Sequence, residues 1–330
     1  EKRKGIDLRI FAVSNSSKTL LNVEGIHSSW RDDLETVNVF HQTKSIIEFA
    51  KRHHLENLIA IDNTASESFV SNYEDFIANG FDLVSSNKIA NTLGFDYYKT
   101  IRGHLEKNQK QYLYETNVGA GLPLIDTIKL LHLSGENITR IKGVFSGSLS
   151  YIFNTFSEDE IPFSEIVKKA MEKGYTEPDP REDLSGNDVG RKLLILAREL
   201  DLENEFSDIH IENLIPDYLQ NVGFEDFMES IASMDEVFSK IKNDQDSGHV
   251  LRYVGDLHGD LQQEKGILDV KLISVPKSSA LGQVNGSDSI IEIYTESYGE
   301  NPLVIQGAGA GAAVTARGVF GDVIRIAEKK

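Results

Sequence analysis

The sequence predicts an α/β protein in two parts: a mostly parallel sheet covered by helices, and an α+β domain. Short apolar strands alternate with amphipathic helices over about the first third of the chain, which is typical of a parallel sheet with helices on both faces. Three longer strand-like segments follow one another towards the C-terminal end, as in an antiparallel sheet. With 330 residues, 40% of them hydrophobic, the chain is long enough for two domains.

Four short strands are expected in the first part. Each is a run of aliphatic and β-branched residues that stops at a polar or glycine-containing turn. The segments between them carry apolar residues at helical spacing. We expect the strands at residues 6–14, 58–62, 81–85 and 111–115, and the helices at about 39–54, 67–79 and 88–107.

No glycine-rich turn that could hold a pyrophosphate is found before residue 6. In open α/β sheets that turn follows the first strand. We therefore expect residues 6–14 to be the second strand of a nucleotide-binding sheet, beside an unpaired position for the first. Residues 1–330 alone are then expected to bind a dinucleotide weakly, because the amide donors of that turn are absent.

The second part mixes helices with longer strands. Alternation of apolar and polar residues favours antiparallel strands, and the last strand leads through a glycine loop into a closing helix. We expect strands at 138–145, 250–255, 267–275, 290–294 and 303–306, helices at 149–156, 163–173, 187–199 and 312–328, and an acidic helical stretch from 202 to about 242.

Composition excludes several classes of function. The formal net charge of −18 argues against nucleic-acid binding, because a phosphate backbone requires a basic surface. The chain has no cysteine, which excludes disulfides, thiolate zinc sites and cysteine nucleophiles and suits a reducing cytoplasm. No apolar run approaches the length of a membrane span, so we expect no membrane partner.

The segment Gly174–Lys192 carries the strongest chemical signal. Pro178 and Pro180 favour an extended turn at its start. Asn187 is expected to cap the helix that continues through the apolar run Leu193–Ala197. The segment therefore leads from an irregular turn into a helix that enters the interior.

On that helix Asp188 and Lys192 lie four residues apart and share one face. Such a pair is most often a solvated ion pair. Lys192, however, borders an apolar run, and a lysine in a partly dry site can have a pKa low enough for proton transfer. Glu177 and Asp183 could converge on the same lysine, where carboxylates would suit a substrate ammonium group.

Polar residues that follow strands are candidates for cofactor binding, because ligands of open α/β sheets bind at the carboxyl ends of strands. Ser14 and Asn15 stand where a carboxylate would bind the ribose of NAD, which favours NADP. Thr64 precedes a predicted helix N-terminus, and Lys88 follows the strand at 81–85. Each has an alternative explanation as a turn residue, a helix cap or an exposed lysine.

Two glycine-rich segments suggest close backbone approach. Gly307, Gly309 and Gly311 resemble a dinucleotide fingerprint, but no further strand can fit after Gly311, so this is not the primary phosphate loop. A secondary approach to the cofactor and close helix packing both stay open. The segment Glu115–Pro123 could turn several carbonyl groups towards a hard cation, or it could be an interdomain hinge.

Five segments together resemble the homoserine dehydrogenase family, whose members reduce L-aspartate 4-semialdehyde to L-homoserine with NAD(P)H. The longest and most specific is Gly174–Lys192, which reads GYTEPDPREDLSGNDVGRK. The other four are Ser86–Lys88, Tyr114–Pro123, Phe145–Tyr151 and Gln306–Val319.

The resemblance implies a Rossmann-like nucleotide-binding domain at 1–117 and 303–330, and a substrate-binding and dimerisation domain at 118–302. It implies that Lys192 is the general acid and base and that Lys88 lies between cofactor and substrate. We further expect substrate contacts at Glu177, Asp183, Asp188, Gly147, Ser148 and Tyr175, cofactor contacts at Thr64, Lys88, Gly311, Ser14 and Asn15, and a sodium-like cation at Glu115, Val118, Ala120 and Leu122.

The resemblance also implies a homodimer in the cytoplasm, either of the fungal type or as the dehydrogenase half of an aspartokinase fusion. Aspartate-semialdehyde dehydrogenase forms a thioester on cysteine, so a chain without cysteine does not fit that enzyme. A non-catalytic regulatory or dimerising remnant of the same fold is the remaining alternative. The presence of Lys88, Glu177, Asp188 and Lys192 together argues against it.

Overall fold

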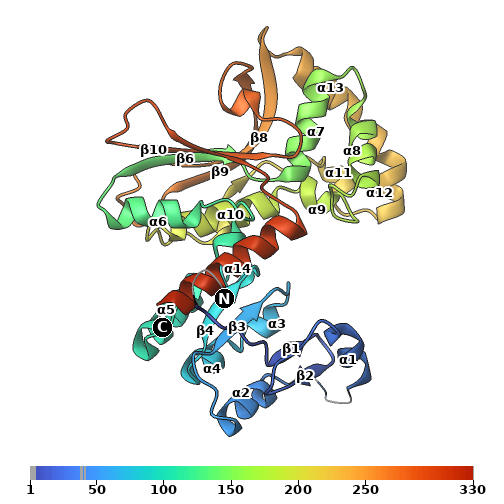
Figure 1. Ribbon diagram of the computed structural model, residues 1–330. Coiled ribbons are helices and arrows are strands. Elements are labelled where there is room, and N and C mark those ends of the chain that lie inside the picture. The colour runs from blue at the N-terminus through green and yellow to red at the C-terminus, as the bar shows by residue number, and fades with distance from the viewer. Residues whose placement is uncertain (1–4, 38–39, 41, 330) are drawn as a thin grey trace. The chain divides into compact units, whose positions relative to one another are not determined.

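The computed structural model describes residues 5–37, 40 and 42–329 and confirms the α/β class (Figure 1). The chain forms two compact units. Unit 1 consists of Glu1–Ser85, Lys99–Leu113 and Gly321–Lys330, and unit 2 of Ser86–Tyr98 and Tyr114–Phe320.

Unit 1 is built on a parallel sheet of three strands in the order β3 (Ile59–Asp62), β4 (Asp82–Ser85) and β5 (Tyr112–Leu113). All four residues of the central strand β4 are buried, including the polar Asp82 and Ser85 at its ends. Three of the four expected strands are thus confirmed. The helices that accompany them are α2 (Thr43–Arg52), α3 (Glu67–Val70), α4 (Tyr73–Ala78) and α5 (Phe95–Asn108), of which α5 begins in unit 2.

The prediction for residues 6–14 was wrong within the described part of the chain. Only β1 (Ala12–Ser14) is a strand, and it pairs antiparallel with β2 (Thr19–Leu21) in a separate two-stranded sheet. Asn15 explains the reversal, because its Oδ1 accepts the backbone N–H groups of Ser17 and Lys18 and closes a tight turn. Helix α1 (Trp30–Thr36) follows, and part of the helix expected at 39–54 lies outside the described residues.

The helix expected at 67–79 is interrupted between α3 and α4. Asn72 lies at the break, and its side-chain amide donates to the carbonyls of Ser68 and Phe69. A side chain that takes up helix carbonyls competes with the helix itself. The result is two short helices in place of one.

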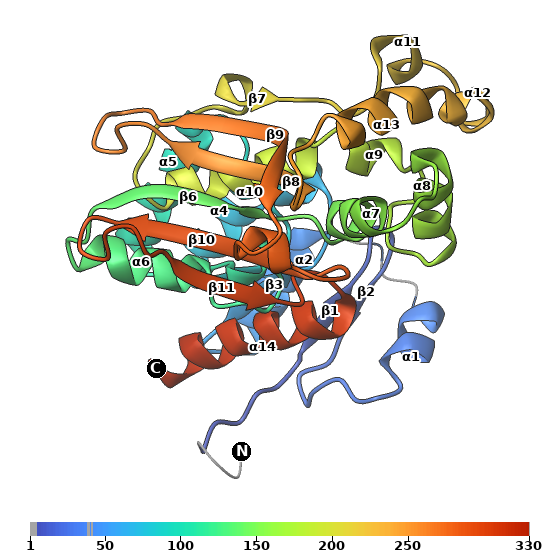
Figure 2. The ribbon, with the colours of Figure 1, turned by 90° about the horizontal axis from the view of Figure 1, so that it is seen from above.

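Unit 2 contains a six-stranded sheet in the order β11-β10-β6-β8-β9-β7 (Figure 2). All neighbours are antiparallel except β7 and β9, which confirms the expected antiparallel strands. Helices α7 and α10 pack against β8. The strands are β6 (Ile138–Val144), β7 (His210–Ile211), β8 (His249–His258), β9 (Ile267–Pro276), β10 (Ser289–Thr295) and β11 (Leu303–Gly307), and the first helices are α6 (Ile125–Leu133), α7 (Gly147–Glu158), α8 (Phe163–Glu172), α9 (Arg181–Leu184) and α10 (Asn187–Arg198).

The stretch from 202 to 242 is not one helical segment as expected. Pro216 and Gly223 stand at the N-caps of two of its pieces, where proline and glycine interrupt regular structure. The pieces are η3 (Phe206–Asp208), β7, α11 (Asp217–Gln220), α12 (Phe224–Ser230), η4 (Ile231–Met234) and α13 (Asp235–Asn243).

The boundaries of the compact units differ from the expected division at 117 and 303. Strand β11 pairs with β10 and therefore belongs to the sheet of unit 2. The closing helix α14 (Ala312–Glu328) has the expected bounds, and the chain re-enters unit 1 only at Gly321. The turn at 86–98 also belongs to unit 2. Among the described residues, no helix is both long and apolar enough to cross a membrane.

Candidate active site

Helix α10 organises the candidate site in unit 2. Its apolar run Leu193–Ala197 is fully buried, as predicted, which fixes the orientation of the helix. The predicted cap was wrong: Asn187 is the first helical residue, and the cap is Gly186 with φ of 76°. A Cβ on Gly186 would lie 2.1 Å from Tyr253 Oη, so the turn needs glycine for both its backbone conformation and its space.

Asp188 lies between two lysines. Its Oδ2 is 2.7 Å from Lys192 Nζ and its Oδ1 is 3.5 Å from Lys88 Nζ. The side chains of Lys192, Lys88 and Asp188 are 12%, 31% and 44% exposed. The sequence therefore placed the Asp188–Lys192 pair correctly, and the structure adds Lys88 from a turn 100 residues away in the chain.

The two lysines determine the charge of Asp188. Burial by itself raises the pKa of the Asp188 carboxyl, but the positive charges of Lys192 and Lys88 outweigh burial and hold that pKa well below its ordinary range. Asp188 is therefore ionised at neutral pH. Lys192 also donates a hydrogen bond of 2.8 Å to the carbonyl of Phe145, which holds its amine in one place. Sequence reasoning missed this carbonyl, since a backbone acceptor leaves no side-chain signal.

Asp183 forms a second polar cluster in unit 2. It accepts hydrogen bonds from Ser148 Oγ at 2.6 Å and from the backbone N–H of Glu177 at 2.9 Å. Burial raises the pKa of the Asp183 carboxyl, and these two donors oppose that rise. Asp183 thus joins the start of α7 to the turn that carries Glu177.

The other predicted substrate residues surround that turn. Glu177 is exposed, and its carboxylate makes no hydrogen bond or ion pair with the residues that the structure describes. Tyr175 stacks on Tyr151 with ring centroids 4.6 Å apart. Gly147 is the first residue of α7, where an added Cβ would lie 3.1 Å from the carbonyl of Ser287.

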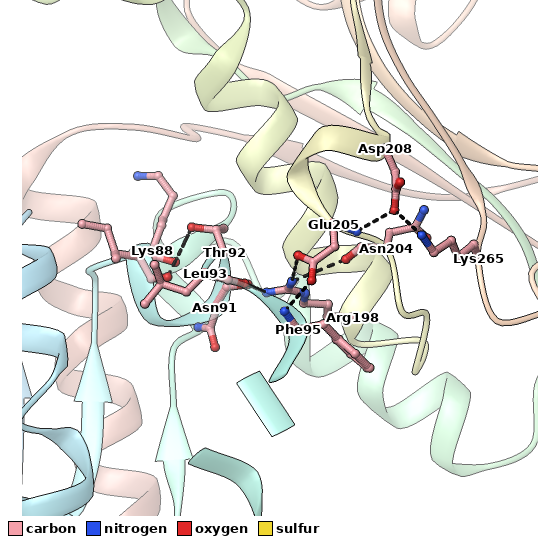
Figure 3. Close-up of polar contacts among 11 residues, drawn as sticks. Lys88, Asn91, Thr92, Leu93, Phe95, Arg198, Asn204, Glu205, Asp208 and Lys265 are labelled. Carbon is pink, nitrogen blue, oxygen red and sulfur yellow. Dashed lines mark hydrogen bonds and ion pairs between the residues drawn. The ribbon is translucent and has the colours of Figure 1, made fainter. Parts of the chain in front are cut away.

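The turn after β4 presents Lys88. Asn87 Oδ1 accepts the backbone N–H of Ile89 at 3.0 Å, and Lys88 caps the short helix η1 (Ile89–Asn91). Figure 3 shows the Lys88 side chain leaving this turn. The lysine is half-buried and paired with Asp188, so it is not the exposed turn lysine of the alternative explanation.

The predicted cation loop starts at a buried carboxylate. Glu115 accepts the backbone N–H groups of Ile125 and Asp126 at 2.8 and 3.0 Å, at the N-terminus of α6. Burial, followed by the charge of Asp126, raises the pKa of Glu115 to about 8. The chain then turns through Val118 and Ala120, the latter with φ of 53°, to Leu122. Among the described residues there is no cluster of three or more metal-binding side chains, so a cation here would depend on backbone oxygens.

Three predicted cofactor residues lie in unit 1. Ser14 ends β1, and Asn15 forms the following turn, with both side chains exposed. Thr64 lies between β3 and α3, as predicted, and its backbone N–H donates to Asp62 Oδ1 at 2.8 Å. The actual cap of α3 is Ser66, whose hydroxyl accepts the N–H of Phe69.

The glycine loop before α14 lies in unit 2. A Cβ on Gly309 would lie 1.9 Å from Ser289 Oγ, so Gly309 is explained by close packing. Gly311 has φ of 112° and open space around the position of a Cβ. Packing therefore accounts for Gly309, whereas the backbone conformation accounts for Gly311.

A parallel α/β unit joined to an α+β unit that holds a lysine–aspartate–lysine centre is the organisation of a two-domain oxidoreductase. Comparison with known proteins defines the family. The family described as Homoserine dehydrogenase matches residues 123–324, and the family described as Homoserine dehydrogenase, NAD binding domain matches residues 1–115. The chain belongs to the homoserine dehydrogenase family.

Individual relatives agree with this membership. A bifunctional aspartokinase/homoserine dehydrogenase of Haemophilus influenzae is 38% identical over 98% of this chain, and the chain spans 39% of that protein. A homoserine dehydrogenase of Paracoccidioides brasiliensis is 40% identical over 82% of this chain and 74% of its own length. The chain thus spans between 35% and 39% of the length of the bifunctional relatives.

Solved structures confirm the fold. A Candida auris protein described as of unknown function has 32% identity and a TM-score of 0.88, covering 98% of this chain and 92% of its own. A protein of Archaeoglobus fulgidus, described as a putative homoserine dehydrogenase, has 22% identity and a TM-score of 0.74 over 97% of this chain and 89% of its own. At 22% identity the second likeness concerns the fold alone.

Proposed function

We propose that the protein catalyses the reaction of its family, the reversible NAD(P)H-dependent reduction of L-aspartate 4-semialdehyde to L-homoserine. The observation that carries the proposal is the centre in which ionised Asp188 lies between Lys88 and Lys192. One lysine there can transfer a proton while the other keeps the site positively charged. Family membership supplies the choice of substrate.

Lys192 is the proposed proton donor to the aldehyde oxygen, and it takes the proton back in the reverse direction. The Phe145 carbonyl and Asp188 restrain its amine, so the donor is already oriented before a substrate arrives. Asp188 also forms an ion pair with each lysine. Lys88, held 3.5 Å from the same carboxylate, adds positive charge close to the developing alkoxide.

Glu177 is proposed to bind the substrate ammonium group, with Asp183 as its support. The Glu177 carboxylate is exposed and has no partner among the described residues, so it keeps its capacity to accept hydrogen bonds. Asp183 fixes the backbone of Glu177 and binds Ser148. Gly147 and Tyr175, which border this cluster, remain proposed substrate contacts.

The nicotinamide cofactor supplies the hydride when bound. Ser14 and Asn15 stay proposed cofactor contacts, but β1 is not a strand of the parallel sheet, so the residues at its end do not distinguish NADP from NAD. Thr64 and Gly311 are two further proposed cofactor contacts. Gly311 fits such a role because the space beside it is open, although its φ of 112° alone already favours glycine.

A monovalent cation, proposed to be sodium, suits the loop of Glu115, Val118, Ala120 and Leu122. Burial and the charge of Asp126 raise the pKa of Glu115, so ionising this carboxyl is costly and a positive charge nearby would favour it. A cation bound to the loop carbonyls would supply that charge. Glu115 also accepts the backbone N–H of Ile125, and this hydrogen bond holds the start of the loop next to the N-terminus of α6.

The assembly and the location of the whole protein are proposals that rest on the relatives. Several relatives are named bifunctional aspartokinase/homoserine dehydrogenase, which supports an aspartokinase domain in the same protein. We propose a homodimer that acts in the cytoplasm on a small-molecule substrate. Size-exclusion chromatography with light scattering tests the dimer.

The activity test uses the full-length protein encoded by the gene. Homoserine-dependent reduction of NADP⁺ and of NAD⁺ is followed by absorbance of the reduced nicotinamide. Turnover with homoserine and none with serine or threonine is the expected result. A pure, folded protein without turnover on either cofactor would leave the non-catalytic remnant as the better explanation.

A further inference from the structure

The last residue of α10 is a fully buried arginine outside the centre described above. The Arg198 side chain has no exposed surface, although it directly follows the apolar run Leu193–Ala197. A guanidinium in such a place is costly unless several acceptors surround it. Its position in the sequence, in the last turn of an apolar helix, is also a common one for a structural arginine.

Two acceptors of Arg198 lie on the turn that follows Lys88, and two more are supplied by Asn204 and Glu205 (Figure 3). Nη1 donates to the carbonyls of Asn91 at 2.8 Å and Leu93 at 2.7 Å. Nη2 is 3.2 Å from Glu205 Oε2, and the other oxygen of Glu205 accepts the backbone N–H of Phe95 at 2.7 Å. One arginine–glutamate pair therefore binds the backbone of residues 91–95 at three points.

The bound segment is tied directly to Lys88. The Lys88 carbonyl accepts the backbone N–H of Asn91 at 3.0 Å and the hydroxyl of Thr92 at 3.2 Å. These bonds close the same turn whose Asn91 and Leu93 carbonyls accept hydrogen bonds from Arg198. A shift of the Asn91 and Leu93 carbonyls would therefore move the backbone of Lys88.

The geometry is specific for arginine. The guanidinium lies over the rings of Phe95 and Tyr98, with its carbon 5.7 and 5.1 Å from the ring centroids. Tyr98 Oη in turn donates to the Arg198 carbonyl at 3.2 Å. A lysine has the charge but neither the planar stacking surface nor the forked donors.

We propose that Arg198, with Glu205, is a positioning residue that sets the Lys88 amine against Asp188. Helix α10 carries Asp188 in its first turn and Arg198 at its end. One helix therefore holds the Asp188 carboxylate and, through Arg198, the backbone turn of Lys88, whose amine faces that carboxylate. This proposal rests on the proposed function only for its kinetic test. The placement of Lys88 can be measured without turnover.

The kinetic test is a double-mutant cycle on the full-length protein. Arg198→Lys is expected to lower kcat by about 10- to 10²-fold, because small misplacements of a catalytic group cost rates of that order. In a Lys88→Met background the same change should cost no more than about 2-fold, because the group that Arg198 positions is already gone. An equal loss in both backgrounds means that Arg198 does not act through Lys88.

Arg252→Lys is the matched control for loss of a buried guanidinium. Arg252 is also buried in unit 2, but it donates to the carbonyls of Leu281 and Gly282. Its replacement should lower the melting temperature. Any change in kcat should be the same with Lys88 present and in the Lys88→Met background. Glu205→Gln, which keeps the shape of a half-exposed side chain, serves as a second variant if Arg198→Lys does not fold.

The second readout is the acetylation rate of Lys88 by acetic anhydride, measured by mass spectrometry on the folded proteins. Arg198→Lys or Glu205→Gln should change that rate several-fold, and Arg252→Lys should leave it unchanged. An unchanged Lys88 rate in both test variants overturns the proposal. An inactive wild-type protein with a changed Lys88 rate would instead contradict the proposed function and keep the positioning role.

Discussion

Two carboxylates of unit 2, Asp188 and Glu115, are held in opposite ways. Burial raises the pKa of each carboxyl. At Asp188 the charges of Lys192 and Lys88 reverse that effect. At Glu115 the two backbone N–H donors of Ile125 and Asp126 do not, and the pKa stays near 8.

The difference shows what full charges do that backbone dipoles do not. Two ammonium groups within 3.5 Å keep Asp188 ionised, so it can orient lysines over the whole neutral range. At Glu115 burial and the charge of Asp126 outweigh the backbone amides, so this carboxyl titrates close to neutral pH. The first arrangement suits a permanent catalytic centre, and the second suits a site that gains a cation.

The largest expected effect comes from removing the lysine nearest Asp188. Lys192→Ala should lower kcat by about 10²- to 10⁴-fold with little change in cofactor affinity, because general acid–base help is lost. Steady-state kinetics with homoserine and cofactor titration measure both. Lys271→Ala is the matched control, since Lys271 also lies 2.7 Å from an aspartate, Asp269, away from the centre. Wild-type turnover in Lys192→Ala would make Lys88 the leading donor.

The second effect concerns Glu177, whose carboxylate has no ion-pair partner among the described residues. Glu177→Gln should reduce kcat/KM for homoserine by about 10- to 10²-fold, because a charged hydrogen bond to the substrate is worth about 1.5–3 kcal/mol. The exposed neighbour Glu182 provides the control Glu182→Gln, which should leave kcat/KM unchanged. A lower melting temperature with normal kinetics in the folded fraction would identify Glu177 as structural.

The comparison also shows which parts of the site a sequence can reveal. The spacing of Asp188 and Lys192 is local, so helical periodicity predicted their contact. Lys88 was predicted as a site residue, but its pairing with Asp188 depends on the turn at 86–98 belonging to unit 2. Arg198 was not predicted, because two of its acceptors are backbone carbonyls of that distant turn.

The same reasoning explains the errors in the fold. Residues 6–14 have the composition of a sheet strand, but the Asn15 turn pairs β1 with β2 locally. The helix break at Asn72 and the cap at Gly186 were likewise decided by single side chains or by one backbone angle. Long apolar strands and the closing helix were predicted well because many residues contribute to each.

The third effect acts through the turn that starts α10. Gly186→Ala should destabilise the protein by more than about 1–2 kcal/mol, the usual cost of a left-handed residue with a side chain, because the new Cβ also meets Tyr253 Oη. Gly248→Ala is the control for backbone conformation alone, since Gly248 has φ of 79° with open space. Urea unfolding measures both, and equal losses would remove the steric part of the explanation.

The smallest effect tests the charge of Glu115 by pH. The folded state holds its proton up to about pH 8, whereas the unfolded chain releases it near the ordinary carboxyl pKa of about 4.3. Between these values the folded state binds more protons, so this group makes stability fall as pH rises. The melting temperature should therefore decline from about pH 5 to about pH 8 and level off above it, at roughly 2–4 °C for each kcal/mol lost in a domain of 150–250 residues.

Glu115→Gln should flatten that decline, because the amide does not ionise. Sodium should flatten it too if the loop of Val118, Ala120 and Leu122 binds the cation, since a bound charge stabilises the ionised carboxylate. Wild type and variant are therefore compared in sodium chloride and in tetramethylammonium chloride at equal ionic strength. A sodium effect confined to wild type supports a cation at Glu115. The same pH slope in wild type and Glu115→Gln would show that this carboxyl does not titrate differently in the folded protein, and the contrast with Asp188 would lose its basis.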